Sequence, residues 1–334
     1  MLAAACGDDS DSDDAAGSTS TSESQGSTTE AEQPPEPVEI TIGWNGVTTN
    51  SIMPVLAQEA GLFPDHFDVK IEVVASTDLA RLLSTGQLDV VYFSAPNLEL
   101  AAAAGAPVAW LAGVQPFPDV VLIGHEEIET MEDFRGKPIA VSAPGTFGAL
   151  MTTWALNEAG LSNDDVTIVP LGTAGAILAS FTSGQVKGWA TNSPTLQAAL
   201  AAVPGSHELF DHYEEEVDWI GNGIGANTEW VADHPEATVE LLEALQAAQE
   251  LFFSDPEMTK SVIQKSIPNI TPADVETSYE WVSGRMAKTL TAIEAGTVRN
   301  EIDFLIENGF PQMQQLTPDD LVLPDYLQEA LGEG

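Results

Sequence analysis

Neutral polar side chains gather at the ends of several apolar segments in this chain of 334 residues. Most are hydroxyls and amides, glycines stand among them, and full charges are nearly absent from the same positions. Neutral donors and the backbone N–H groups of helix N-termini can hold an anion without any basic side chain. We therefore predict a ligand-binding site made of Trp44, Asn45, Thr48, Thr49, Ser76, Ser94, Asn97, Ser142, Gly145, Thr146, Phe147, Thr191 and Asn192.

Two parts of this set favour different ligands. The glycine-rich segment Gly145–Gly148 is the best single candidate for an anion, because small residues let the backbone approach an oxyanion closely. An ordinary helix N-cap explains the same residues equally well. Trp44 can lie flat against a ring or an alkyl chain, although a buried tryptophan at a strand end is the alternative. A small anion and a heteroaromatic solute are therefore both left open.

The residues needed for catalysis or metal binding are largely missing. The single cysteine, Cys6, precedes the predicted folded region, and no Gly-x-Ser-x-Gly or Walker sequence occurs. The segment Gly221–Gly225 has dinucleotide-loop glycines but no clear helix at the required spacing. His207 and His212 stand close together in an acidic segment that is typical of a solvated loop. We expect neither an enzyme nor a bound cofactor or metal.

The charge balance excludes another class of partner. There are 52 Asp and Glu against 10 Lys and Arg, which gives a formal net charge of −42. Such a surface repels phosphate backbones, so we expect no nucleic-acid partner. No stretch approaches the roughly 18 uninterrupted apolar residues that a membrane span requires.

The first residues suggest a membrane tether. The run Ala3-Ala4-Ala5-Cys6-Gly7 resembles the lipobox of bacterial lipoproteins, which makes Cys6 a candidate lipidation site; a chance cysteine is the alternative. Residues 8–37 consist almost entirely of Ser, Thr, Asp, Glu, Gly and Pro. A segment of this composition buries too little apolar surface to repay the entropy of ordering. We expect residues 1–37 to be a lipid-anchored, disordered tether.

The elements that must position the candidate site alternate in type. Strands are predicted at 38–43, 69–74, 88–93 and 108–114, with helices between them, which is typical of a parallel α/β sheet. The pattern restarts with strands at 120–124, 138–142, 166–170 and 186–190, and the chain is mostly helical from about residue 235. Ligands of such sheets lie beyond the carboxyl ends of the strands, which is where the candidate residues stand.

Several short segments together resemble one family. They are Ala60-Gly61-Leu62-Phe63, Thr85-Gly86-Gln87-Leu88-Asp89-Val90, Gly105-Ala106-Pro107-Val108, Phe134–Val141, Ser183-Gly184-Gln185-Val186 and Asp233–Ala237. In this order they resemble the ABC importer substrate-binding proteins of the SsuA/TauA and NMT1/THI5-like family, which take sulfonate, taurine, nitrate or thiamine-precursor solutes. Lys187 stands where the family usually has an acid in the second glycine turn.

The resemblance implies an α/β type II periplasmic-binding-protein fold, with two doubly wound lobes joined by crossover strands. It implies one lobe from 38–117 and 225–334, another from 118–224, and hinges near 111–121 and 219–227. A small organic or inorganic anion of the sulfonate, taurine or nitrate class would bind between the lobes. A pyrimidine-type thiamine precursor is the alternative, and an enzyme on the same fold a distant one. An extracytoplasmic, monomeric lipoprotein that delivers its solute to an ABC permease and its ATPase is implied.

Overall fold

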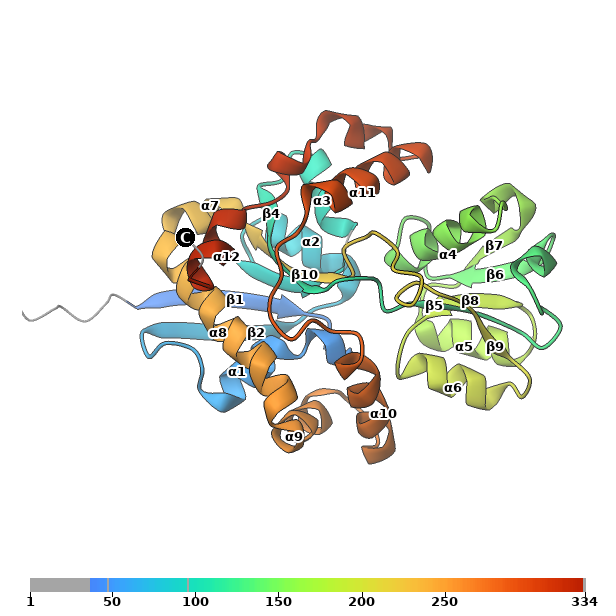
Figure 1. The fold of residues 1–334 in the computed structure, drawn as a ribbon, viewed down its shortest axis with the longest axis horizontal. Helices are drawn as coiled ribbons and strands as arrows, with labels where there is room; N and C mark the ends of the chain where they lie inside the picture. Colours follow the sequence, from blue (N-terminus) through green and yellow to red (C-terminus); the bar gives the residue numbers. More distant parts are fainter. Residues whose placement is uncertain (1–36, 47, 95, 333–334) are drawn as a thin grey trace, which may run out of the picture. The chain divides into compact units, whose positions relative to one another are not determined.

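The computed structural model describes residues 37–332 apart from Val47 and Ala95, and apart from the side chains of Ser76 and Thr77. The predicted lipidation site at Cys6 and nearly all of the predicted tether lie outside the described residues. The described part of the chain forms two five-stranded sheets (Figure 1). This confirms the predicted fold class of two α/β units.

The first sheet has the strand order β2-β1-β3-β10-β4. Strand β1 pairs in parallel with β2 and with β3, whereas β10 runs antiparallel between β3 and β4. Because β10 comes from far along the chain, the two units are interleaved and not merely in tandem. The strands are β1 (Val38–Trp44), β2 (Phe67–Val73), β3 (Val90–Phe93), β4 (Val108–Gln115) and β10 (Asn222–Asn227).

The second sheet repeats this arrangement with the order β7-β6-β8-β5-β9. Here β5 is the antiparallel strand, paired with β8 and β9. The four strands predicted for the first sheet are parallel to one another, whereas β5 and β10, which each follow a crossing between the sheets, are antiparallel to their neighbours. Each of these strands enters its sheet from the other sheet, and therefore runs opposite to its neighbours. The strands are β5 (Val121–Gly124), β6 (Pro138–Val141), β7 (Thr167–Pro170), β8 (Gly188–Thr191) and β9 (His207–Asp211).

Helices cover both faces of each sheet. In the first, α1, α8 and α9 pack with Ile40 and Ile42, while α2 and α3 pack with Val91 and Phe93. In the second, α4 covers one face and α5 and α6 the other. The helices are α1 (Met53–Ala60), α2 (Ser76–Ser84), α3 (Asn97–Ala103), α4 (Phe147–Glu158), α5 (Ala174–Thr182), α6 (Thr195–Ala202), α7 (Thr228–Asp233), α8 (Pro235–Ser254), α9 (Pro256–Ser266), α10 (Pro272–Ser283), α11 (Ala295–Glu307) and α12 (Pro324–Ala330).

Short 3₁₀ turns complete the described elements. They are η1 (Thr49–Ser51), η2 (Met131–Phe134), η3 (Asn163–Asp165), η4 (Pro311–Gln315) and η5 (Pro318–Asp320). Local sequence sets several boundaries: proline is the first residue of α8, α9 and α10, and Gly61 ends α1 with a positive φ of 65°. Among the described helices, none combines the length and apolar character needed to cross a membrane.

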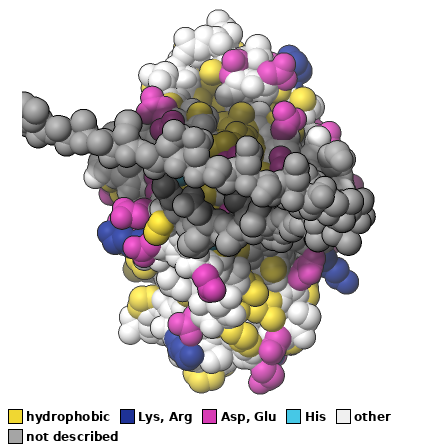
Figure 2. All heavy atoms as spheres, turned by 90° about the vertical axis from the view of Figure 1, so that its left-hand side faces the viewer, with side chains coloured by type: hydrophobic (Ala, Val, Ile, Leu, Met, Phe, Trp, Pro, Cys, Tyr) yellow, Lys and Arg dark blue, Asp and Glu magenta, His cyan; other side chains and the backbone are white. Residues whose placement is uncertain are grey.

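Most of the few basic residues are held in ion pairs. Acidic side chains are spread over the face in Figure 2, where basic ones are sparse. Lys187, the departure from the family pattern, has its Nζ 2.5 Å from an oxygen of Glu127. This hydrogen-bonded lysine lowers the pKa of the Glu127 carboxyl to about 2. Glu127 follows the end of β5 and Lys187 precedes the start of β8, and these two strand ends are paired. Lys187 therefore serves a local contact at one end of the second sheet.

The chain crosses between the sheets twice, and the two crossing segments touch. The first leads from β4 to β5 through Phe117, and the second returns from β9 to β10 through Gly221. A Cβ atom on Gly221 would lie only 2.2 Å from the carbonyl oxygen of Phe117. His212, at the start of the return, is fully buried, with ring nitrogens 2.8 Å from the carbonyl oxygens of Val120 and Met151. The predicted solvated loop is therefore wrong for the two histidines, since His207 begins β9 and His212 is buried in the turn that follows, whereas residues 214–216 of that turn are exposed.

The C-terminal segment makes a further connection between the sheets. Near Arg285 the backbone follows β4, since the N–H of Ala287 donates to the carbonyl of Val114. The guanidinium of Arg285 lies 3.4 Å over the ring of Trp281 and donates to Asp211 at the end of β9, at 2.6 Å. Trp281 packs against the cores of both sheets. The two crossing segments are therefore not the only contacts that connect the sheets.

A pair of buried carboxyl groups fixes α11 beside the return crossing. Glu99 in α3 and Glu301 in α11 are both fully buried. Trp110 donates its indole N–H to Glu99 at 2.7 Å, and the N–H of Ile220 donates to Glu301. Burial, reinforced by the neighbouring Glu99 carboxylate, raises the pKa of Glu301 well above its ordinary value, and burial also raises the pKa of Glu99. The pair is therefore most stable when it retains a proton.

We predict that Gly221→Ala lowers the free energy of unfolding by about 3 kcal/mol, at the upper end of overpacking costs, because the backbone of Phe117 must move. Gly175→Ala is the matched control, since nothing lies within 4 Å of its Cβ position and it sits in α5. Alanine there should be neutral or slightly stabilising. Urea unfolding measures both variants, and equal stability of Gly221→Ala and the wild type would contradict the close crossing.

A second prediction concerns pH. Since the folded-state pKa of Glu301 is raised, its contribution to stability is complete below the ordinary value near 4.5 and is lost as pH rises through the folded-state pKa. Glu301→Gln keeps an oxygen for the N–H of Ile220 and cannot ionise. It should therefore be more stable than the wild type at pH 8, by about 1 kcal/mol or more. Urea unfolding from pH 5 to 8 tests this, with Glu307→Gln on the exposed side of α11 as control. A wild-type pH profile unchanged by Glu301→Gln would refute it.

Candidate binding cleft

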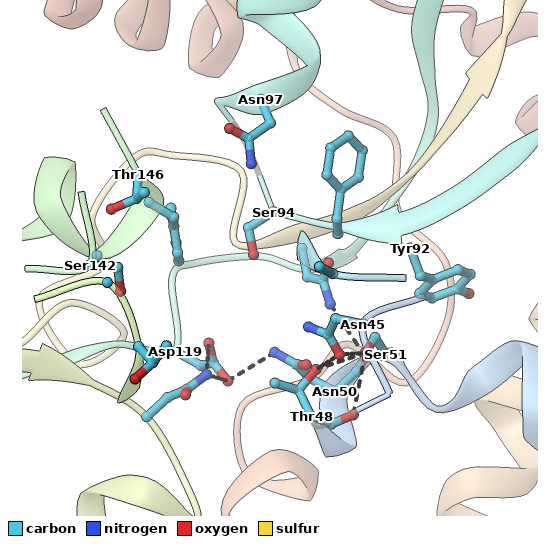
Figure 3. A pocket seen from close by; sticks show the side chains of 18 residues that line it. Asn45, Thr48, Asn50, Ser51, Tyr92, Ser94, Asn97, Asp119, Ser142 and Thr146 are labelled. Atoms are coloured by element: carbon cyan, nitrogen blue, oxygen red, sulfur yellow. Dashed lines mark hydrogen bonds between the residues drawn. The ribbon is translucent and has the colours of Figure 1, made fainter. Parts of the chain in front are cut away.

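A cleft of about 530 Å³ lies between the ends of strands from both sheets. Polar side chains face each other across it: Figure 3 shows Thr48, Asn50 and Ser51 on one side and Ser142 and Thr146 on the other. The first group follows β1 and the second follows β6. The cleft is therefore built from the carboxyl ends of parallel strands in both sheets, as the strand-end rule predicts.

Eight of the predicted residues line this cleft. In the first sheet they follow β1 and β3, and in the second they follow β6 and β8. The structure thus brings together residues that lie up to about 150 positions apart in the sequence. They are Asn45, Thr48, Ser94, Asn97, Ser142, Thr146, Phe147 and Asn192.

Four predicted residues are not brought to the cleft wall. Trp44 is 2% exposed in the core of the first sheet. It is therefore a core residue and does not offer its ring for stacking on a ligand. Thr49 is buried in η1, and Thr191 is buried at the end of β8, opposite Val121. Gly145 has a positive φ of 79° and faces Phe310, outside the cleft. In each case the local strand or turn points the residue away from the ligand side.

Ser76 completes the predicted set; it is the first residue of α2, and its side chain lies outside the described structure. Two other residues of types common in binding sites do not contribute to the cleft wall. Arg81 is exposed and pairs with Asp78. Trp219 is fully buried between the rings of Trp154 and Phe304, so it belongs to the core.

Sequence reasoning missed several residues of the cleft wall. They include Asn50, Ser51, Tyr92, Phe93, Asp119, Thr173 and Asn222. Asp119 and Asn222 lie on or beside the crossing segments, which were treated only as hinges. The apolar end of β3 gave no sign that Tyr92 would line the cleft. The hydroxyl of Thr173 could have been found, because it is the N-cap of α5 and accepts the N–H of Ala176 at 3.3 Å.

Backbone groups provide the positive potential of the cleft. Helix α4 begins at Phe147, and the hydroxyl of its N-cap, Thr146, donates to the carbonyl of Ala143 and does not cap the helix. The first N–H groups of α4 are thus left without this side-chain acceptor and carry the positive end of the helix dipole. Among the described residues of the lining, none is Lys, Arg or His. An anion held there would be held by helix N-termini and neutral side chains.

One carboxyl group stands against this pattern. Asp119 is 3% exposed at the end of the first crossing and lines the cleft. It accepts hydrogen bonds from the amide of Asn50 at 3.1 Å and from the amide of Asn192 at 3.3 Å (Figure 3). Burial raises the pKa of Asp119, and the bond from Asn192 opposes this shift. Asp119 thereby links a residue that follows β1 to one that follows β8.

Tyr92 borders the cleft, but its ring extends away from Ser142 and Thr146 on the facing side (Figure 3). The side chain is fully buried at the end of β3, and its hydroxyl has no hydrogen-bond partner among the described residues. Burial raises the pKa of Tyr92, so the phenol stays protonated. A buried hydroxyl without a partner costs stability.

The cleft shows no arrangement for nucleophilic or metal chemistry. Its described hydroxyls are not hydrogen-bonded to a histidine or a carboxylate; those of Thr48 and Ser51 bond each other and Asn45. Within the described residues no group of three or more His, Cys, Asp or Glu could hold a metal ion. What the arrangement can do is surround a small molecule with donors from two sheets.

We predict that Tyr92→Phe stabilises the protein without ligand by about 1 kcal/mol, because it removes an unpaired buried hydroxyl. Because this hydroxyl is buried, the same change should leave the binding of a ligand in the cleft unchanged. Tyr279→Phe is the matched control, since its hydroxyl donates to the carbonyl of Phe252 at 3.1 Å. That variant should lose stability and leave binding unchanged. Thermal unfolding and calorimetric titration together separate the two patterns, and a destabilised Tyr92→Phe would contradict the prediction.

Comparison with known proteins adds a family and a fold. The family profile described as NMT1/THI5 like matches residues 48–259. The chain is 25% identical over 304 residues to the Brucella abortus protein named "Putative binding protein BAB2_1146", covering 86% of this chain and 91% of that one.

Solved structures share the fold. The alkanesulfonate-binding protein SsuA of Xanthomonas axonopodis pv. citri, bound to MOPS, matches with a TM-score of 0.72 at 20% identity, covering 87% of this chain and 100% of that one. The aliphatic sulphonate binding protein SsuA of Escherichia coli has the same TM-score of 0.72 at 21% identity, over 83% of this chain and 92% of that one. At these identities the likeness establishes the periplasmic-binding-protein fold.

Proposed function

The chain belongs to the NMT1/THI5-like family, and on this premise we propose that it is the extracytoplasmic solute-binding protein of an ABC importer. Its lobes would comprise residues 38–117 with 225–334, and residues 118–224. A small solute would be captured between them and delivered to a permease powered by an ATPase. A lipid on Cys6, a monomeric state and the absence of catalysis belong to the same proposal.

One observation carries the proposal: the cleft is lined by strand-end residues of both sheets. A molecule that bonds Asn97 on one side and the N-terminus of α4 on the other gains contacts only when both sides surround it. A ligand shifts a conformational equilibrium by its difference in affinity for the two states. Binding would therefore favour the closed arrangement, in the manner of hinge-closing proteins.

The first candidate solute is a small anion of the sulfonate, taurine or nitrate class. The free N–H groups at the start of α4 and the neutral hydroxyls and amides around it suit an oxyanion. The second candidate is a pyrimidine-type thiamine precursor or another heteroaromatic vitamin. Aromatic side chains in the lining favour it, namely Tyr92, Phe93 and Phe147.

We expect the full chain to bind at least one member of a panel of taurine, ethanesulfonate, nitrate, 4-amino-2-methylpyrimidine and riboflavin. A ligand at a hundredfold excess over its Kd should stabilise the protein by about 2.7 kcal/mol. Asn97→Ala and Phe147→Ala, from opposite sides of the cleft, should each weaken binding by about tenfold. Asn157→Ala, on the exposed part of α4, should not.

The ligand recovered by denaturation should be chemically unchanged. Recovery of an altered product would instead favour the enzyme alternative. If the two cleft variants bound the active compound as tightly as Asn157→Ala does, the cleft would not be the site.

A further inference from the structure

We propose that Asp119 is a specificity determinant of the cleft: the solute carries an N–H donor, such as an amine, an amidine or a ring amino group, that binds this carboxylate. The inference rests on the proposed function and adds a requirement to it. The solute would present an acceptor or anionic group to the helix N-termini and a donor group to Asp119. A bare oxyanion would lack the second group.

The position of Asp119 makes it unlike every other residue of the cleft wall. It is the one residue with a carboxylate among the described residues of the lining. The described residues of the lining include no cation. The charge of Arg285 reaches Asp119, but its guanidinium is hydrogen-bonded to Asp211 at 2.6 Å. A carboxylate 3% exposed in a cleft that takes only a bare anion would repel the ligand at short range. Neutral amides alone would serve such an anion better.

The hydrogen bonds around Asp119 leave room for a further donor. Its Oδ2 accepts the amide of Asn50 at 3.1 Å, whereas the amide of Asn192 is shared between the two oxygens at 3.3 and 3.4 Å. An ionised carboxylate has about four acceptor sites. Gln115 also interacts with this carboxyl. A ligand N–H would take the remaining acceptor site or replace the long contacts to Asn192, and a charge-assisted bond there would be shorter and stronger than those contacts.

The two amides also connect this recognition to both sheets. Asn50 follows β1, and its backbone carbonyl accepts the side-chain amide of Asn222, the first residue of β10, at 3.4 Å. Asn192 follows β8 in the other sheet. A donor bound to Asp119 would lie where groups from both sheets converge. Recognition of the donor is thus completed only when the two sides of the cleft are together.

A purely structural role is the alternative for Asp119. In that case the carboxylate only ties Asn50 to Asn192, and the affinity of a solute does not depend on whether it has a donor. The two roles differ in how the wild-type protein treats ligands that are matched except for one N–H group. This comparison needs no variant, so it holds even where a variant fails to fold.

The test is calorimetric titration of the full chain with two matched pairs: taurine with ethanesulfonate, and 4-amino-2-methylpyrimidine with 2-methylpyrimidine. In at least one pair the wild type should bind the amino compound at least about tenfold more tightly. Asp119→Asn should reduce this preference to about threefold or less. Asp218→Asn removes an exposed carboxylate outside the cleft and should retain the full preference. Circular dichroism checks that both variants fold.

The outcomes separate the inference from the proposed function. If compounds of the panel bind but the wild type prefers the amino compound in neither pair, the inference is overturned and the solute-binding function stands. The inference is also overturned if Asp119→Asn binds ethanesulfonate more tightly than the wild type does and keeps the wild-type preference for the amino compound. If neither these compounds nor any other member of the panel binds, the proposed function fails and the inference fails with it.

Discussion

Gly221 lies so close to the backbone of Phe117 that no side chain fits between the two crossing segments. This contact fixes where the chain leaves and re-enters the first sheet. Because the return crossing leads directly into β10, it also fixes the antiparallel strand between β3 and β4. Asp119 and Asn222 stand on either side of the same crossing region, so the contact between the crossing segments also sets the positions of these two cleft residues. The interleaved fold and the binding groups thus depend on one tight approach of two backbones.

The electrostatics of the cleft differ from those of the chain as a whole. The sequence carries a formal net charge of −42, yet Asp119 is the one acid among the described residues of the lining. Positive potential comes from backbone N–H groups at the start of α4, and such dipoles act within about one helical turn. Salt shortens the reach of the surface charge to about 8 Å at physiological ionic strength. Local dipoles can therefore decide what binds despite an acidic surface.

Much of the fold and part of the cleft could be predicted from the sequence. Alternation of strands and helices, with the family resemblance, predicted two α/β units, and the strand-end rule found Asn97, Thr146 and Asn192. It could not find Asp119, because that residue precedes a strand that runs against its neighbours. It misplaced Trp44, because a residue at a strand end can face either the core or the ligand. His212 lies in a turn, but the exposed glutamates next to it gave no sign that its ring is buried and contacts two carbonyl groups.

The Arg285 contact has a mechanical consequence. Two residues further on, the N–H of Ala287 is bonded to β4 of the first sheet, and the guanidinium of Arg285 is paired with Asp211 of the second. Both side chains of this ion pair are about one-seventh exposed or less. A rotation that separates the sheets must break this ion pair or break the hydrogen bonds between the segment near Arg285 and β4. Charges this far buried are costly to leave unpaired. The ion pair therefore adds to the free-energy cost of separating the two sheets.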